Sequence, residues 1–343
     1  MSQFTVEIMQ LRKRPYEHGL AIGKKFKGNV MLEQLENLVK PEINVTDMKK
    51  LYRTFDPILL EEIEGIAEGL ELNFSKTAAL ISGYDVPKTP ALGCTTLCSK
   101  EFYVRNYDFG PELYDGVFTL YQNDKKDTFA HAGYNLQLIG RHDGVNENGL
   151  VAGLHFVSNE DYRVGISPWI SVRMILDKCS SVDEAILLLK EIPHAACYNF
   201  SVADRNGNMA AIEASPKKVE VRWEEDWLSC VNHFQLEELR EKNRSIIDGS
   251  LKREQYLNTM KNKCFTHNNM YSTFKDKHSP VFFTEYEQLF GTLHTFSYSF
   301  IDDRILTTVA CGEKDLNVIF GEWVKGANVK EENLIGRITE IEI

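Results

Sequence analysis

The chain has 343 residues, of which 43% are hydrophobic, so it is long and apolar enough to bury a large core as one folded unit. Its formal net charge of −11 argues against nucleic acid as a partner, because phosphate binding needs a basic face. Seven cysteines at scattered spacings favour reduced thiols over a disulfide framework, and none of the spacings predicts a zinc site or another metal.

The N-terminal region predicts a soluble, helical start. Charged residues from Glu7 to Arg14 stand where a signal peptide would need an apolar stretch, and nowhere do eighteen apolar residues run together, which predicts a cytoplasmic protein without a membrane span. Asp56 as N-cap, followed by Pro57 at the first helical position, predicts a helix. Its apolar residues recur at helical spacing: Ile58, Leu59, Ile63, Ile66, Ala67 and Leu70.

The pair Gly93-Cys94, within residues 90–97, predicts a site where the protein cuts itself. A glycine accepts backbone angles that are closed to other residues, so its carbonyl can be presented to the thiol that follows. Attack there would make Cys94 a new N-terminus, whose α-amino group titrates near pKa ~7.7–8.0 and can serve as the base. Alone, the pair also fits a buried cysteine that merely packs.

Residues 94–98 and 102–108 predict two adjacent strands joined by a reversal at 99–101. This hairpin would bring Arg105 and Asp108 near Cys94. A guanidinium favours the thiolate, and a carboxylate can orient the α-amino group. The alternative is a salt bridge between Arg105 and Asp108 on an exposed hairpin.

The later half predicts a second helix, capped by Ser181 and ending near residue 192, among antiparallel strands. One strand places Tyr198, Phe200 and Val202 on one face, and another places Phe296, Tyr298 and Phe300 on one face. Turns at 204–207 and 302–304 suit hairpins. The mixed charges from 240 to 263 indicate a solvated helical face.

Several motifs occur in one order along the chain. They are Gly93-Cys94-Thr95-Thr96, Arg105-Asn106-Tyr107-Asp108, the run 144–154, the run 202–207 and Val231-Asn232-His233-Phe234, together with the runs 14–19 and 62–69. In this the chain resembles the autoproteolytic penicillin (isopenicillin N) acyltransferase-like family, which is related to choloylglycine hydrolases and penicillin V acylases.

The resemblance implies the α+β fold of N-terminal nucleophile hydrolases, a four-layer αββα sandwich. Residues 1–93 would form a mostly helical N-terminal segment, a propeptide or small chain that stays associated after cleavage. Residues 94–343 would form the αββα catalytic portion, and the two would make one globular unit.

By the same resemblance, Asn232 matches an asparagine whose amide forms part of the oxyanion hole; the alternative is an asparagine that caps a turn before a helix near Leu236. His155 and Thr95 would shape the substrate pocket, although a histidine on such a strand is more often structural. Relatives also carry a later arginine near the nucleophile. Residues 270–283 contain only Lys275, Lys277 and His278 as basic residues, so that role stays unassigned.

The predicted function is an amide-bond enzyme in which Cys94 forms an acyl thioester and passes the acyl group to water or to an amine. An N-acyl amide hydrolase and an acyl-coenzyme A-dependent transferase are equal candidates. No cofactor is expected beyond acyl-coenzyme A as a co-substrate, the partners are small molecules, and a homo-oligomer stays open. The alternatives are an uncleaved cysteine–histidine amidase, with His155, His233 or His294 as base, and a non-catalytic binding protein.

Overall fold

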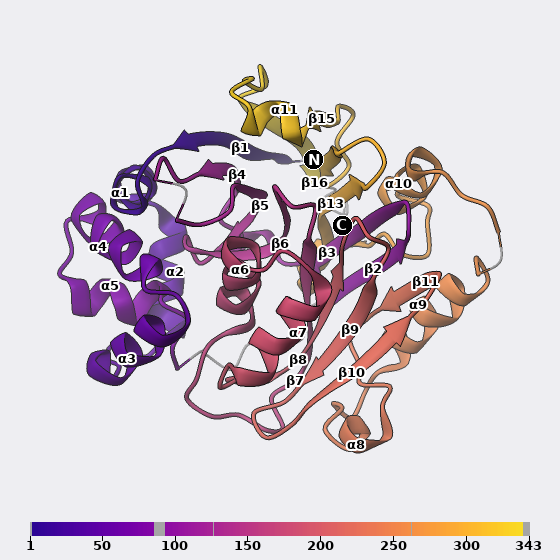
Figure 1. The fold of residues 1–343 in the computed structure, drawn as a ribbon, viewed down its shortest axis with the longest axis horizontal. Helices are drawn as coiled ribbons and strands as arrows, with labels where there is room; N and C mark the ends of the chain where they lie inside the picture. Colours follow the sequence, from indigo (N-terminus) through magenta and orange to yellow (C-terminus); the bar gives the residue numbers. More distant parts are fainter. Residues whose placement is uncertain (1, 86–92, 126, 262, 339–343) are drawn as a thin grey trace.

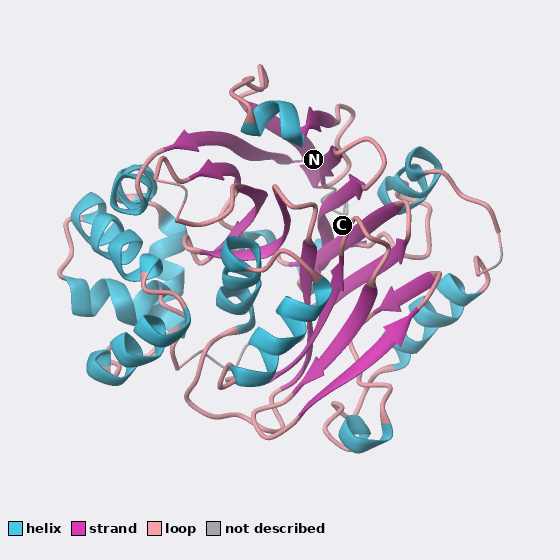
Figure 2. Cartoon of the chain, in the orientation of Figure 1, coloured by secondary structure: helices cyan, strands magenta, loops and turns pink. Residues whose placement is uncertain are grey.

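The computed structural model describes residues 2–85, 93–125, 127–261 and 263–338. These residues form two β-sheets stacked on each other, with helices on the outer faces and a group of helices at one side (Figures 1 and 2).

The first sheet has nine strands in the described residues and is antiparallel except where β1 runs parallel to β4. In sheet order its strands are β10 (Val219–Glu224), β9 (Met209–Ala214), β8 (Cys197–Ala203), β7 (Val151–Ser158), β6 (Gly140–Asn146), β5 (His131–Leu136), β4 (Val117–Gln122), β1 (Ser2–Arg12) and β16 (Asn333–Ile338).

The second sheet is antiparallel throughout the described residues. Its strands in order are β11 (Trp227–Cys230), β2 (Gly93–Ser99), β3 (Phe102–Phe109), β13 (Phe290–Ser299), β14 (Arg304–Val309) and β15 (Leu316–Ile319), and the short β12 (Thr284–Glu285) pairs with β13.

The two sheets and their covering helices make four layers. Helices α6 (Pro168–Lys178) and α7 (Val182–Glu191) pack on the first sheet, α9 (Asp248–Asn258) and α10 (His267–Lys275) pack on the second, and β2 packs across the interface against β7. Because both faces of the central strands are covered, β3 and β8 are buried along their whole length. The predicted four-layer αββα sandwich is therefore confirmed.

The N-terminal region is not only helical. Its helices are α1 (Pro15–Phe26), α2 (Val30–Leu38), α3 (Val45–Phe55), α4 (Ile58–Leu70) and α5 (Phe74–Ile81), which gather at the left of Figure 1. Before them, however, β1 enters the first sheet between β4 and β16. The segment before Cys94 thus contributes a strand to the sandwich, which the sequence analysis did not predict.

Helices α1 and α4, which carry the two N-terminal motif runs, touch backbone to backbone. A Cβ atom on Gly19 would lie 2.0 Å from the carbonyl oxygen of Glu62, and one on Gly65 would lie 2.0 Å from that of Tyr16. Glycine is required at both positions because no larger residue permits this approach. These glycines therefore have a packing role.

Most of the local predictions hold. Ser181 caps α7 by accepting a hydrogen bond from the backbone N–H of Glu184, and the turns at 204–207 and 302–304 join antiparallel strands. Strand β13 ends at Ser299, so the predicted Phe300 lies outside it in the turn. Helix α4 begins at Ile58, one residue later than predicted, and the buried Asp56 carboxylate before it lies 3.6 Å from the Lys178 ammonium.

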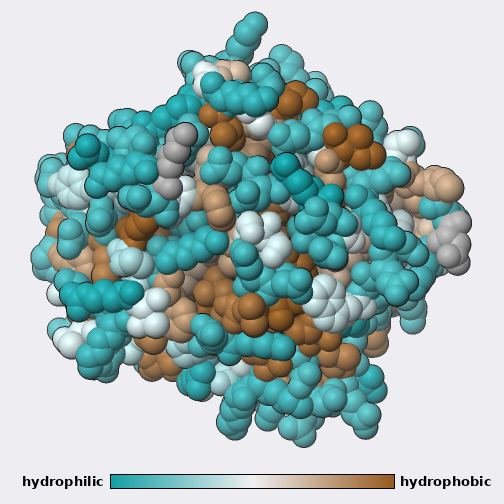
Figure 3. Space-filling view, viewed as in Figure 1, coloured by the Kyte–Doolittle hydropathy of each residue, from teal (hydrophilic) through white to brown (hydrophobic). Residues whose placement is uncertain are grey.

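The remaining short helices are α8 (Glu237–Arg240), α11 (Phe320–Val324), η1 (Pro111–Leu113) and η2 (Tyr286–Gln288). No helix in the described part of the chain is long and apolar enough to cross a membrane. Figure 3 shows mostly polar side chains on the face in view, with apolar ones gathered below its centre, in the region of α7. All seven cysteines are free thiols.

Candidate active site

Cys94 lies at the start of β2, fully buried between the two sheets. The predicted hairpin is present: Cys94 pairs with Tyr107, and Gly93 pairs with Asp108. Because side chains alternate along a strand, Arg105 and Tyr107 point toward the first sheet with the Cys94 thiol, whereas Asp108 points toward the opposite face. Arg105 and Asp108 therefore approach the cysteine from opposite sides of β3.

Arg105 contacts the thiol directly. Its Nη2 lies 3.1 Å from Sγ of Cys94, and its Nη1 donates to a carboxylate oxygen of Asp143 at 2.5 Å. The same Asp143 oxygen lies 2.8 Å from Nε2 of His294, whose Nδ1 lies 2.7 Å from the Tyr114 hydroxyl. Every side chain in this series is buried. Asp143 and His294 thus hold the guanidinium in place, and sequence analysis did not assign either residue to that task.

A glycine on the facing sheet leaves room for this arginine. A Cβ atom on Gly153, in β7, would lie 2.7 Å from Cδ of Arg105 and 2.4 Å from the Tyr103 hydroxyl. The motif run 144–154 therefore includes a glycine that gives Arg105 passage between the sheets.

Asp108 does not pair with Arg105, so the exposed salt bridge considered as an alternative is wrong: both side chains are fully buried. One Asp108 oxygen accepts from the Thr292 hydroxyl at 2.7 Å, and the other has no hydrogen-bond partner among the described residues. Burial raises the pKa of Asp108 to about 6, although the nearby charge of Arg253 opposes the shift. One oxygen of the Asp108 carboxylate therefore accepts no hydrogen bond from the described residues and can accept a proton.

This second oxygen, Oδ2, lies 4.0 Å from Nη1 of Arg253 and also lies against Gly93. A Cβ atom on Gly93 would lie 2.9 Å from Oδ2 of Asp108 and 2.7 Å from the Phe290 ring. Any other residue at position 93 would push the carboxylate away from the Gly93-Cys94 peptide. The structure thus gives a steric reason for the glycine, beside the conformational one. Residues 86–92, which include the first part of the predicted run, lie outside the described residues.

Arg253 is a further residue beside Cys94 that the sequence analysis missed. Its Nη1 donates to the Cys94 carbonyl oxygen at 2.6 Å and to the Thr95 hydroxyl at 2.8 Å, and its Nη2 donates to Oδ1 of Asn232 at 2.9 Å. Arg253 lies on α9, within the charged run 240–263 that was predicted to be a solvated face, yet it is only 2% exposed. This inward-facing arginine fits the later arginine that could not be assigned.

Asn232 lies beside the cysteine because of strand register. Cys230 pairs with Thr96 at the end of β11, so Asn232 continues the antiparallel pairing to the level of Cys94. Its Oδ1 accepts the backbone N–H of Cys94 at 2.8 Å, and its Nδ2 donates to the Phe156 carbonyl at 2.8 Å. The side chain caps no turn or helix near Leu236, so the alternative role as a cap is wrong.

His155, on β7, lies between the two sheets, as the Cys94 thiol does, and contacts two hydroxyl groups rather than the thiol. Its Nε2 lies 3.3 Å from the Thr96 hydroxyl and 2.9 Å from the Ser201 hydroxyl. Burial, assisted by the charge of Arg105, holds the pKa of His155 well below its usual range, so the ring is neutral. His155 is thus a hydrogen-bonded residue in the wall of the site.

The other two histidines considered as bases are engaged elsewhere. Nδ1 of His233 lies 2.9 Å from the Ser250 hydroxyl, and its Nε2 lies 3.3 Å from the carboxylate of Glu254. His294 uses both ring nitrogens within the series of contacts that ends at Arg105. These ring nitrogens are therefore committed to partners other than the Cys94 thiol.

The thiol is held in its neutral form. Burial raises the pKa of Cys94 to about 11, and this effect outweighs the opposing charges of Arg105 and Arg253. Arg105 thus lowers the pKa of the Cys94 thiol, as predicted, but by less than burial raises it.

Comparison with known proteins places this site in a family context. A model of the family described as acyl-coenzyme A:6-aminopenicillanic acid acyl-transferase matches residues 96–314, which include Arg105, Asp108, Asn232 and Arg253. The match begins just after Cys94. No curated protein sequence matches the chain.

Three solved structures are similar to the chain at low sequence identity. A mutant conjugated bile acid hydrolase from Clostridium perfringens is 11% identical, with a TM-score of 0.43, over 66% of this chain and 92% of that one. Penicillin V acylase from Agrobacterium tumefaciens is 13% identical, with a TM-score of 0.41, over 67% and 80%. The Caenorhabditis elegans N-acylethanolamine-hydrolyzing acid amidase ortholog is 14% identical, with a TM-score of 0.41, over 60% and 93%.

Proposed function

Because the chain belongs to the acyl-coenzyme A:6-aminopenicillanic acid acyl-transferase family, we propose that it is an N-terminal nucleophile enzyme that forms an acyl thioester on Cys94. The observation that carries the proposal is the set of contacts around this one residue. Arg105 donates to its thiol, Asn232 accepts from its backbone nitrogen, and Arg253 donates to its backbone carbonyl.

The first step is self-cleavage. Sγ of Cys94 attacks the carbonyl carbon of Gly93, the carbon–nitrogen bond between the two residues breaks, and the freed nitrogen takes the thiol proton. The resulting thioester between Gly93 and Cys94 is then hydrolysed by water, which leaves a carboxylate on Gly93 and a free thiol on Cys94. Asp108, whose Oδ2 lies against Gly93 and accepts no hydrogen bond from the described residues, is suited to accept and return the proton.

Turnover reuses the same atoms. The new α-amino group of Cys94 takes the thiol proton, and the sulfur attacks the substrate carbonyl carbon. The departing amine accepts that proton as the carbon–nitrogen bond breaks, and the acyl group stays on sulfur. Water or a second amine then attacks the thioester and restores the thiol.

Charge that develops on the substrate oxygen needs donors that are already oriented. Asn232 donates one N–H to the Phe156 carbonyl, which fixes the plane of its amide and leaves the second N–H for an oxyanion. One such donor in a dry site is worth roughly 3–4 kcal/mol of transition-state stabilisation. His155 lies on the thiol's side of β2 and would shape the pocket. Thr95 lies on the opposite face of β2, where its hydroxyl accepts a hydrogen bond from Arg253.

The acceptor of the acyl group decides between an amide hydrolase and an acyl-coenzyme A-dependent transferase, and both use every residue named above. The substrate is a small acyl amide or an acyl-coenzyme A, without a metal or a further cofactor. The compartment proposed for this activity is the cytoplasm.

The experiment is intact-mass measurement of purified protein. The proposal expects fragments of 93 and 250 residues in place of the 39.3 kDa chain, and the 250-residue fragment should begin at Cys94. Cys94→Ala should stay whole and inactive. Cys98→Ala is a matched control, because Cys98 is an equally buried cysteine on the same strand.

An intact but active chain would instead support the uncleaved cysteine–histidine amidase. His155 would then be its base, because it alone of the three histidines faces the strand that carries Cys94. An intact chain that turns over no acyl amide, with a thiol that alkylates slowly, would support a non-catalytic binding protein.

A further inference from the structure

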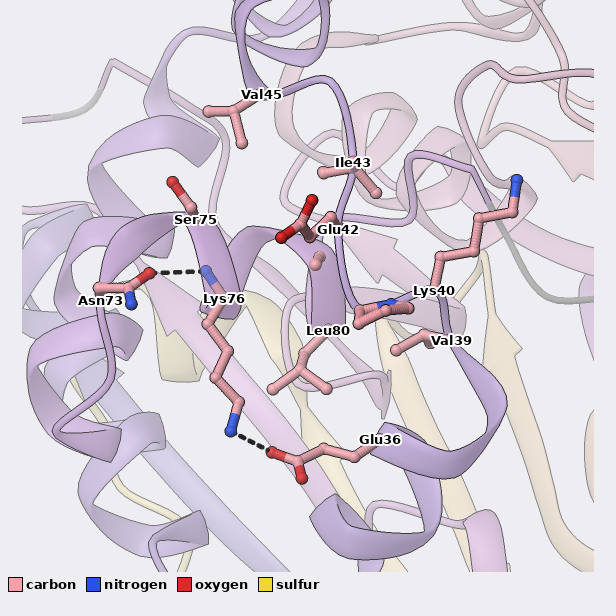
Figure 4. Close-up of a pocket in the computed structure, with 12 residues that line it drawn as sticks. Glu36, Val39, Lys40, Glu42, Ile43, Val45, Asn73, Ser75, Lys76 and Leu80 are labelled. Atoms are coloured by element: carbon pink, nitrogen blue, oxygen red, sulfur yellow. Dashed lines mark hydrogen bonds and ion pairs between the residues drawn. The ribbon is translucent and has the colours of Figure 1, made fainter.

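A cavity of about 630 Å³ lies between helix α2, helix α5 and the segment that joins α2 to α3 (Figure 4). Both lysines that line it are paired: Lys76 lies 2.9 Å from a carboxylate oxygen of Glu36, and Lys40 lies 2.6 Å from one of Asp85. None of its described lining residues belongs to β2 or β3, the strands of the candidate active site. A positive charge without a partner lies instead beside that site, on Arg244.

Arg244 lies in the segment between α8 and α9, where its guanidinium is only partly engaged. Its Nε donates to the carbonyl oxygen of Ile246 at 3.1 Å, and its Cζ lies 5.9 Å from the centre of the Phe156 ring, within the range of a cation–π contact. Its Nη1 is buried and has no hydrogen-bond partner among the described residues. Because a buried donor without an acceptor costs free energy, this nitrogen is suited to an acceptor from outside the chain.

The segment that carries Arg244 is fixed to both sheets. Oδ1 of Asn243 accepts the backbone N–H of Phe234 at 2.7 Å, and its Nδ2 donates to the Phe234 carbonyl at 3.0 Å. The hydroxyl of Ser158, at the end of β7, donates to the carbonyl of Lys242. Arg244 is therefore held between the end of β7 and the chain that follows β11, and a side chain held in this way loses less freedom when it binds a ligand.

Two hydrogen bonds lead from the nucleophile to the ring beneath Arg244. The backbone N–H of Cys94 donates to Oδ1 of Asn232 at 2.8 Å, and Nδ2 of Asn232 donates to the Phe156 carbonyl at 2.8 Å. Burial and the charge of Arg253 lower the pKa of Arg244, whereas a negative charge on the Cys94 thiol opposes this shift. The guanidinium thus lies within electrostatic reach of the thiol.

The other two arginines around the thiol have carboxylate partners. Arg105 donates to Asp143 at 2.5 Å, and Arg253 lies 4.0 Å from Asp108. Arg244 forms no ion pair with any described residue, so its charge is uncompensated. A planar guanidinium with an unpartnered Nη group is complementary to the oxygens of a carboxylate or a phosphate.

We propose that Arg244 is a specificity-determining residue that binds an anionic oxygen group of the substrate, a carboxylate or a phosphate. This inference rests on the proposed function, because it assumes that a substrate carbonyl carbon lies at Sγ of Cys94. The anionic group belongs to the acyl part, to the amine part or to coenzyme A, and in each case it pairs with the same guanidinium. The ion pair holds the substrate while Cys94 attacks, and Arg244 itself takes no part in bond breaking.

The test uses the protein as purified and three pairs of compounds, each an acid and its uncharged counterpart. Succinanilic acid and its amide place the charge on the acyl part, and N-acetylglycine and its amide place it on the amine part. Acetyl-coenzyme A and S-acetyl-N-acetylcysteamine differ in the phosphates. In one pair the wild-type kcat/KM for the charged member should exceed that for the uncharged member by about tenfold or more, and that pair identifies the source of the anion.

Arg244→Gln removes the charge at a partly exposed position, where folding should be retained. It should lower kcat/KM for the preferred charged compound by about tenfold or more and leave the uncharged member of the pair within about twofold. Arg244→Lys keeps the charge without the planar fork and should fall between the two. Arg240→Gln is the matched control, because Arg240 is an exposed arginine on α8 whose Nη2 donates to the Gln235 carbonyl. It should change none of the six rates.

Binding is also measured without turnover. Each compound is added during alkylation of Cys94 by iodoacetamide, in which sulfur displaces iodide, and the mass of the protein reports the rate. In the wild type the charged member of the preferred pair should protect Cys94 at a lower concentration than the uncharged member. In Arg244→Gln the two should protect equally.

Two results would overturn the inference while the proposed function stands. They are equal turnover and equal protection by the two members of every pair, and an equal loss for both members in Arg244→Gln. A chain that stays whole and turns over none of the compounds would refute the proposed function. The protection measurement then decides the role of Arg244: it binds an anion only if the charged compounds protect Cys94 better in the wild type and not in Arg244→Gln.

Discussion

Replacement of Asp108 by asparagine separates a catalytic carboxylate from a structural one. The substitution preserves the shape of the side chain and its acceptor oxygen for the Thr292 hydroxyl. It removes the charge and replaces the second oxygen, 4.0 Å from Nη1 of Arg253, with an amide NH2 group. Because Asp108 is fully buried, its negative charge lowers the free energy of unfolding. Burial moves its pKa from 3.8 to about 6, and a shift of about two pKa units corresponds to about 3 kcal/mol.

The raised pKa of Asp108 determines how the free energy of unfolding changes with pH. The pKa is raised in the folded chain, so the folded state holds the proton more tightly, and stability falls as pH rises from about 3.8 to about 6. An asparagine at this position cannot ionise and escapes this loss. At pH 8 the asparagine variant should therefore be up to about 3 kcal/mol more stable than the parent, and at pH 4 the gain should shrink below about 1 kcal/mol.

The comparison is made with Cys94→Ala as parent, so that neither chain can be processed. Urea unfolding at pH 8 and at pH 4 gives the free energies of Cys94→Ala and of the double variant with Asp108→Asn. Arg253 keeps its bonds to the Cys94 carbonyl and the Thr95 hydroxyl in both chains.

In the single variant Asp108→Asn, self-cleavage and turnover should both fall steeply, as measured by intact mass and by release of amine. A double variant that is less stable than its parent at pH 8 would refute the reasoning, because the ion pair between Asp108 and Arg253, at 4.0 Å, would then outweigh the cost of burying the carboxylate. Normal processing of the single variant would refute its role in proton transfer.

Three further substitutions test the surrounding contacts. Asn232→Ala should lower kcat roughly 10²–10³-fold per folded molecule with little change in KM, and steady-state kinetics on processed enzyme check this. Asp143→Asn removes the charge partner of buried Arg105 and should cost about 3–5 kcal/mol in urea unfolding, and an unchanged midpoint would contradict the buried pair. Gly93→Ala should fold but stay uncleaved by intact mass, because its methyl group would displace the Asp108 carboxylate.

The parts of the site that sequence predicts are those that a single hairpin brings together. Cys94, Arg105 and Asp108 lie within two consecutive strands, so a reversal at 99–101 is enough to place them side by side. Asn232 also follows from the sequence, though only through the family resemblance, since its position depends on the register of β11 against β2.

Arg253 and Asp143 could not be found in this way. Arg253 lies in a run of alternating charges whose composition is that of an exposed helix, and only the docking of α9 on the second sheet turns it inward. Asp143 meets Arg105 across the gap between the two sheets, and no local pattern encodes a contact between different sheets. The sequence does contain Gly153, and a glycine in a strand predicts that another group approaches closely, but it does not predict which group.

Strand β1 would keep the two fragments together after the proposed cleavage. It pairs with β4 on one side and with β16 on the other, so the first sheet includes strands from before and after Cys94. Among the described residues β16 pairs within this sheet with β1 alone, so a cut at Gly93 would leave a strand of one fragment paired with a strand of the other. Departure of residues 1–93 would also expose the apolar faces of α1 and α4. Burial of this kind is the main favourable term in folding. The cut would therefore free the amino group of Cys94 for catalysis while the two fragments continue to share one core.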